Sequence, residues 1–161
     1  MVVSDEALRP FRSRRGRFVA TVMAVVSLLV FGAIAVLLPT NAGLTTWQPV
    51  DRLLVAGLGV LIALACWRYA TIRAVPSLDG LVVRNLVVTR TLTWAQVVDV
   101  EFGGGEPWVT LELDDTDTVA VMAIQRADGA TAMSEAQRLA GLVRDLGARA
   151  ILVTDIAACR L

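Results

Sequence analysis

The stretch FVATVMAVVSLLVFGAIAVLL, from Phe18 to Leu38, holds twenty-one residues without a charge, an amide or a proline. At about 1.5 Å per residue, a helix of this length is roughly 30 Å long, which is the thickness of the hydrocarbon core of a bilayer. The stretch therefore predicts a transmembrane helix over 18–38, and the rest of the chain is interpreted from it.

A second apolar run, LLVAGLGVLIALACWRYATI, follows at Leu53–Ile72. Its fully apolar part ends at Trp67, but the long side chain of Arg68 can reach the interface while Trp67 lies at the same depth. Residues 39–52 between the two runs are rich in turn formers. We predict a transmembrane hairpin with spans 18–38 and 53–72, joined by an outer loop.

The arginines give the hairpin an orientation. Residues 1–17 carry five arginines, and Arg68 and Arg73 follow the second run. Since basic residues accumulate on the cytoplasmic side, both termini are expected inside, in the plasma (inner) membrane. A cleaved signal peptide is disfavoured because the run is too long and no A-x-A site follows. The alternative for the two apolar runs is a buried helical hairpin in a soluble protein. Nucleic-acid binding by the N-terminal arginines is disfavoured, because their position beside a membrane helix already explains them.

Composition argues against catalysis. All fifteen basic residues are arginine, and the chain has no histidine. The commonest general acid–base and metal ligand is therefore missing, and no hydroxyl or thiol can be paired with a histidine base. We expect a non-enzymatic protein without catalytic, cofactor-binding or metal-binding residues. Cys66 and Cys159 are expected to be free thiols.

Two short motifs resemble ligand loops and are interpreted as turns. The run Gly103-Gly104-Gly105 lacks the Gly-Lys-Ser/Thr that completes a phosphate loop. The aspartates of the run 114–117 lack the glycine and the glutamate of a calcium loop. Both runs are predicted to connect strands.

From about Ala74 the pattern changes to short apolar groups between turn signals. Alternation is clearest in VDVEF and VTLEL, where acids occupy the face opposite the apolar one. These strands predict an antiparallel meander, either a sandwich or a small barrel. The periodicity of Ala130–Leu146 predicts an amphipathic helix that ends at Gly147. We therefore predict a cytoplasmic domain over 73–148 and a C-terminal tail over 149–161.

Aromatic and basic residues outside the predicted core are candidates for contact with a partner protein or with lipid headgroups. For the two tryptophans, packing in the core or at its rim is the alternative interpretation. The candidates are Trp94, Trp108, Arg68, Arg73, Arg84 and Arg90.

The whole pattern resembles a known family. Two apolar helices after an arginine-rich N-terminus, followed by LVVRNLVVTRTLTWAQVVDVEFGGGEPWVTLEL and VAVMAIQRADG, are similar to the small PH-domain membrane proteins of high-GC Gram-positive bacteria. The matching elements are Asp79-Gly80-Leu81, Asn85, Thr93-Trp94, Pro107-Trp108, Met122-Ala123-Ile124-Gln125 and Asp128-Gly129. The resemblance implies an α+β membrane protein, in which a two-helix hairpin precedes a PH-like antiparallel barrel or sandwich closed by a C-terminal helix.

The resemblance implies architecture more than activity. PH domains that bind phosphoinositides use basic residues near the first hairpin loop, but the corresponding loop, 77–80, has no cation. Residues 74–148 hold five arginines against eleven acids, so an anionic leaflet repels the domain as a whole. We expect the domain to bind a membrane protein partner beside the lipid bilayer, as an accessory subunit of a membrane complex. Recognition of lipid headgroups is the alternative, and a transporter or channel subunit is the least favoured hypothesis.

Overall fold

The computed structural model describes residues 4–37 and 48–158, with the helix backbone alone for 149–158. The chain divides into two compact units: Gly16–Thr71 forms one, and Met1–Arg15 with Ile72–Leu161 forms the other. The connection over 39–47 and Cys159 lie outside the described residues. The helices of the first unit are α1 (Arg14–Leu37) and α2 (Pro49–Ala70).

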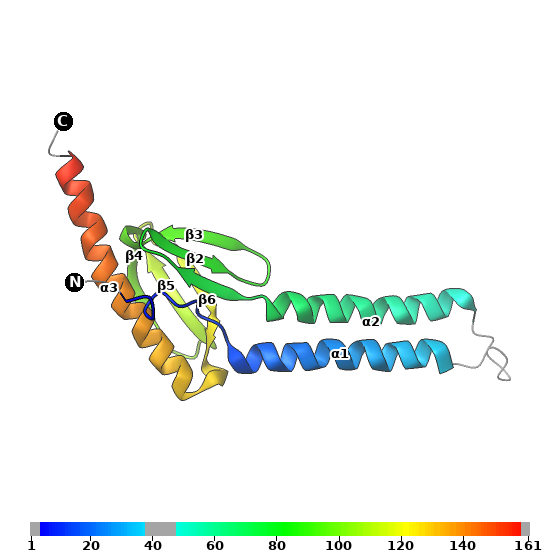
Figure 1. Ribbon diagram of the computed structural model, residues 1–161. Coiled ribbons are helices and arrows are strands. Elements are labelled where there is room, and N and C mark those ends of the chain that lie inside the picture. Colours follow the sequence, from blue (N-terminus) through cyan, green and yellow to red (C-terminus); the bar gives the residue numbers. More distant parts are fainter. Residues whose placement is uncertain (1–3, 38–47, 159–161) are drawn as a thin grey trace. The chain divides into compact units, whose positions relative to one another are not determined.

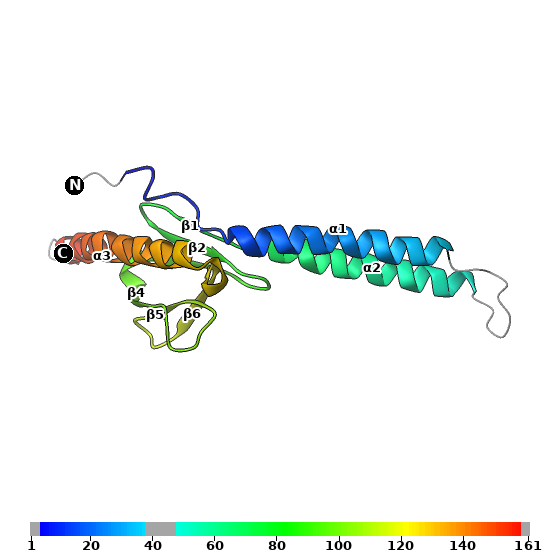
Figure 2. The ribbon, with the colours of Figure 1, turned by 90° about the horizontal axis from the view of Figure 1, so that it is seen from below.

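The two helices pack as an antiparallel pair and lie side by side in perpendicular views (Figure 1 and Figure 2). Their contact is made by small residues, since Ala20, Ser27, Gly59 and Ala63 are buried. The Ser27 hydroxyl donates a hydrogen bond to the Gly59 carbonyl oxygen at 3.1 Å. A Cβ on Gly59 would lie 2.5 Å from the Cβ of Phe31, so a side chain at this position would push the helices apart.

Both helices are long and apolar enough to cross a membrane, as the hydropathy of the sequence predicts. Each begins four residues before the predicted span, α1 at Arg14 and α2 at Pro49. Proline suits the first position of a helix, where its missing N–H costs nothing. The carboxylate of Asp51 accepts a hydrogen bond from the Gln48 backbone N–H at 2.8 Å, which caps the same end.

The second unit contains two three-stranded antiparallel sheets and a long helix (Figure 1). The first sheet is β1 (Arg73–Pro76), β2 (Gly80–Arg84) and β3 (Thr89–Thr93). A short 3-10 helix, η1 (Trp94–Gln96), leads to the second sheet, which is β4 (Val97–Glu101), β5 (Trp108–Leu113) and β6 (Thr118–Gln125). A further 3-10 helix, η2 (Arg126–Asp128), precedes α3 (Ala130–Ala158).

Strand order follows the chain in each sheet, so the predicted meander is confirmed. Within the part of the chain that the structure describes, the two sheets remain separate and no closed barrel forms. Alternate residues of the strands enter a common core together with residues of α3. The fully buried large side chains of this core are Trp94, Phe11, Leu81, Leu111, Ile124, Leu139, Val83, Val109 and Val121.

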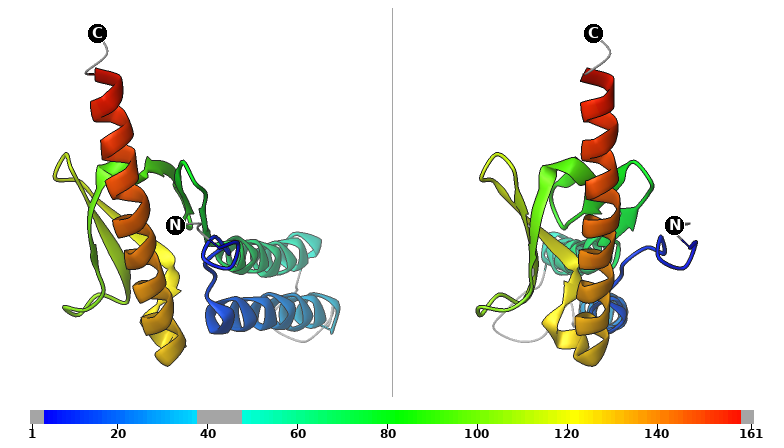
Figure 3. Two further views of the ribbon diagram at one scale, coloured as in Figure 1. Left: turned by 60° about the vertical axis from the view of Figure 1, so that its left-hand side comes forward. Right: turned by 90° about the vertical axis from the view of Figure 1, so that its left-hand side faces the viewer.

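Helix α3 lies along one side of the strands and extends past them (Figure 3). The prediction that this helix ends at Gly147 is wrong, because it continues to Ala158. A helix interior tolerates a glycine at a cost of about 1 kcal/mol. Here the glycine serves packing: a Cβ on Gly147 would lie 3.3 Å from the carbonyl oxygen of Trp94, closer than most side chains approach a backbone oxygen.

The predicted turns are confirmed. The three consecutive glycines lie between β4 and β5, and Gly104 and Gly105 have φ angles of 60° and 101°, which glycine adopts without strain. The aspartate-rich run connects β5 to β6. There the Asp115 carboxylate accepts a hydrogen bond from the Asp117 backbone N–H at 3.0 Å, as in an Asx turn.

Residues 4–13, which we call the strap, belong to the second unit and pack against β1 and α3. Phe11 pairs with Ala74 of β1 through two backbone hydrogen bonds of 2.8 and 3.1 Å, and its ring is completely buried. Arg138 of α3 stacks on this ring and donates hydrogen bonds to the carbonyl oxygens of Ala7 and Arg9 at 3.0 and 2.8 Å. The arginine-rich N-terminus is therefore part of the domain that follows the two helices.

Candidate functional site

A groove of about 320 Å³ opens between strand β4 and helix α3. One wall comes from η1 and β4, and the other from successive turns of α3. The lining residues are Trp94, Ala95, Val97, Val98, Asp99, Val100, Ala140, Val143, Arg144, Gly147 and Ala148. Most of these residues have apolar side chains, but polar and apolar atoms contribute about equally to the groove surface, so the groove suits an amphipathic ligand.

The wall formed by β4 is the edge of a sheet. Among the described strands, β4 pairs with β5 alone, which leaves the backbone groups of its other edge without a ladder partner. The ladder between β4 and β5 is irregular between Val97 and Asp99, and a bulge of this kind turns the edge locally. An edge strand with free backbone groups can accept an extended segment from another chain.

The groove also carries two opposite charges. Asp99 contributes a carboxylate from β4 and Arg144 a guanidinium from α3, and both side chains are exposed. No ion pair joins either of them to another charge among the side chains that the structure describes. Asp99 Oδ1 accepts a hydrogen bond from the Val100 backbone N–H at 2.7 Å, so its second oxygen and the Arg144 guanidinium are the groups that would orient a segment with complementary charges.

The floor of the groove is fixed by Trp94. Its side chain is 1% exposed, and its indole N–H donates a hydrogen bond to the Ser77 carbonyl oxygen at 2.9 Å. Trp94 is therefore not an exposed contact for a partner or lipid: the ring packs in the core, as the alternative interpretation predicts. Trp108 at the start of β5 is half-buried, opposite Gln125 of β6.

The predicted basic candidates do not gather in the groove. Arg68 lies in the last turn of α2, where its guanidinium donates a hydrogen bond to the Thr71 hydroxyl at 3.3 Å. Arg90 on β3 forms an ion pair with Asp117 at 2.7 Å. This hydrogen bond, with a second one from the Thr118 backbone, lowers the pKa of Asp117 below its ordinary value of 3.8.

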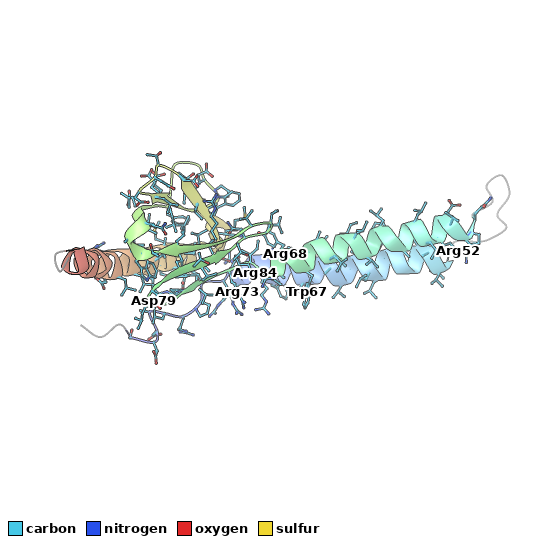
Figure 4. The ribbon with its side chains drawn as sticks, turned by 90° about the horizontal axis from the view of Figure 1, so that it is seen from above. Arg52, Trp67, Arg68, Arg73, Asp79 and Arg84 are labelled. Atoms are coloured by element: carbon cyan, nitrogen blue, oxygen red, sulfur yellow. The ribbon has the colours of Figure 1, made fainter. Side chains whose placement is uncertain are left out.

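Arg73 and Arg84 are brought together by strand pairing. They are direct partners in the register of β1 with β2, so their side chains leave the same face of the sheet. Figure 4 shows the two arginines near one end of the domain and Asp79 at the other.

Sequence reasoning missed the groove and the contact between Arg138 and the strap. The alternation in VDVEF indicated an exposed face on β4 but could not show that β4 is an edge strand. A signal for the strap was present, since Phe11 is the one aromatic residue among the polar residues 4–17. Its role depends on Arg138, which lies 127 positions later, as numbered in the sequence.

Comparison with known proteins agrees with this architecture. Residues 77–142 match the family described as Bacterial PH domain. The chain is 32% identical over 124 residues to Rv1417, an uncharacterised protein of Mycobacterium tuberculosis, in an alignment that covers 77% of this chain and 79% of that protein. The uncharacterised protein Mb1452 of Mycobacterium bovis is similar to the same degree. No solved structure matches the chain at a significant level. The chain, with its two apolar N-terminal helices, belongs to the bacterial PH domain family.

Proposed function

We propose that this protein is a non-enzymatic membrane protein whose cytoplasmic PH-like domain binds an extended segment of a partner membrane protein in the groove between β4 and α3. It would act as an accessory subunit of a membrane complex. The single observation that carries the proposal is the free edge of β4, which forms one wall of the groove.

The edge supports strand addition by a partner. A segment beside β4 would gain backbone hydrogen bonds, while its alternate side chains would enter the groove towards Val143 and Ala140. Val98 is 64% exposed, although apolar residues on a free edge strand favour aggregation. A bound segment would cover this residue.

The two helices support anchorage in a membrane. Only 17% and 11% of their most apolar windows are buried within the protein, whereas a core helix of a soluble protein is mostly buried. Large apolar residues such as Phe18, Leu29 and Leu53 are more than 60% exposed and need an apolar surrounding. With the positive-inside rule, both termini would be cytoplasmic, and tethering would raise the effective concentration of the domain for partners in the same membrane.

Site-specific photo-crosslinking in intact cells tests the proposal. A photoreactive amino acid replaces Val98 in the groove, or Met133 as the matched control, which is 51% exposed on α3 and lies outside the groove lining. We expect one membrane protein to crosslink at position 98 and not at position 133. A second copy of the chain that carries V98R should not bind the crosslinked segment and should therefore not compete for it. The proposal fails if the two positions give the same adducts, or if position 98 gives none.

A further inference from the structure

The turn that joins β2 to β3 exposes three consecutive apolar side chains. Leu86, Val87 and Val88 are 37%, 81% and 55% exposed, although turns at the surface are usually built from polar residues. The Asn85 backbone N–H donates a hydrogen bond to the Val88 carbonyl oxygen at 3.0 Å, so the turn is closed and its side chains point outward. We call residues 86–88 the tip.

The base of the tip is held firmly. The Asn85 side-chain amide donates a hydrogen bond to the Ala120 carbonyl oxygen at 2.7 Å, and its oxygen accepts one from the Met122 N–H at 3.3 Å. Both partners belong to β6, in the other sheet. The tip is therefore held outside the core, where its aliphatic groups remain exposed.

Two arginines lie beside the tip on one face of the sheet. Arg84 directly precedes the turn, and Arg73 is its partner across the β1–β2 ladder. Like charges at directly opposed positions destabilise a sheet unless an anion lies between them. Neither guanidinium forms an ion pair with a carboxylate of the described residues. Two adjacent guanidinium groups offer the parallel donors that bind phosphate oxygens.

The chain runs from the end of α2 directly into this end of the sheet. Arg73 follows Thr71, the C-cap of α2, by two residues, which span at most about 7 Å. The tip begins two residues after Arg84, the cross-strand partner of Arg73. The acidic turn at Asp79 lies at the opposite end of this sheet (Figure 4).

We propose that the tip inserts into the cytoplasmic interface of the bilayer and that Arg73 and Arg84 bind the phosphate of an adjacent lipid headgroup. This inference rests on the membrane anchorage in the proposed function. A bilayer presents phosphate directly above an apolar phase, and the arginine pair and the tip match both layers. The contact would hold the domain with the turn at Asp79 directed away from the membrane.

The test uses the full chain with Cys66 and Cys159 replaced by serine, labelled at single new cysteines and reconstituted into vesicles. The label is placed at V87C in the tip, at L78C in the opposite turn or at L29C on α1; these three positions are 81%, 62% and 66% exposed. Nitroxide groups attached to the lipid chains quench a fluorophore that enters the bilayer. We expect at least threefold stronger quenching at position 87 than at position 78, together with strong quenching at position 29.

Each arginine near an anionic surface raises binding about fivefold. The double variant R73Q/R84Q should therefore reduce quenching at position 87 severalfold in vesicles with phosphatidylglycerol and leave position 29 unchanged. The inference is overturned if positions 78 and 87 are quenched equally, or if position 87 is not quenched while position 29 is. If position 29 is not quenched either, the membrane anchorage fails together with the inference.

Discussion

The guanidinium carbon of Arg138 lies 3.9 Å from the centroid of the Phe11 ring. One residue belongs to the helix that completes the PH-like domain, and the other belongs to the segment that leads into the first apolar helix. Glu135 orients the guanidinium through an ion pair on the same helix. The strap is therefore fastened to the domain immediately before the chain enters α1, in addition to the covalent link that follows α2.

Replacing Arg138 by alanine should release the strap. The variant loses a stacked cation and charge-assisted hydrogen bonds to two backbone carbonyls, so we expect the free energy of unfolding to fall by about 2–3 kcal/mol. Arg138→Lys should recover less than half of the loss, because an ammonium lacks the planar fork of the guanidinium. Denaturation of the full chain in detergent, followed by tryptophan fluorescence, measures both values.

The matched control is Arg144→Ala, which removes an exposed arginine from the same helix. No ion pair is found for Arg144 among the described side chains, so its removal should change stability by less than about 0.5 kcal/mol. Equal losses for the two variants would show that the strap contact contributes nothing.

Gly80 at the start of β2 should not tolerate alanine. A Cβ there would lie in steric conflict with the carbonyl oxygen of Leu92 on the paired strand β3. Since both groups are backbone, only a shift of one strand can relieve the overlap, and we expect Gly80→Ala to cost about 2–3 kcal/mol. Gly103→Ala is the control, because no atom lies within 4 Å of its Cβ position. Thermal unfolding of both variants gives the comparison.

The helices and strands could be predicted from sequence wherever the spacing of apolar residues within one segment determines the structure. Alternation in VTLEL identified β5, and the uncharged run from Phe18 identified α1. The helix end was wrongly predicted at Gly147 because a glycine after an amphipathic stretch is typical of a helix end. In the structure a glycine is needed there because the helix packs closely against the carbonyl oxygen of Trp94, a residue distant in sequence. The contact between Arg138 and the strap and the groove at β4 also depend on pairings between distant segments, and no local pattern encodes them.

Gly59 should be essential for the packing of α1 against α2. A valine at this position would collide with Phe31 and would also displace the carbonyl that accepts the Ser27 hydrogen bond. Gly57→Val is a matched control two residues away, since its Cβ would meet nothing within 4 Å. We expect Gly59→Val to lower the thermal unfolding midpoint of the full chain in detergent, and Gly57→Val to leave it nearly unchanged. Equal midpoints for the two variants would contradict the observed packing.

Thr116 in the turn between β5 and β6 has a φ angle of 65°, a left-handed conformation that a β-branched residue adopts only under strain. Thr116→Gly should relieve about 1–2 kcal/mol of this strain and lose part of the gain to the flexibility of the unfolded chain. The net result should be a stabilisation of about 0.5–1 kcal/mol, measured as a higher denaturation midpoint. Thr118→Gly, in the adjoining strand, should destabilise instead.

Stability should depend on pH through Asp117. Its pKa is lowered first by the hydrogen bond from Arg90, so the folded state favours the ionised carboxylate. The resulting stabilisation is complete above the unfolded pKa, near 3.8, and is lost as the pH falls through the lower folded value. The difference in stability between the wild type and Asp117→Asn should therefore be constant above about pH 5 and shrink below pH 4. Both partners are about half exposed, so 1 M salt should reduce the effect, and a difference that grew on acidification would contradict the assignment.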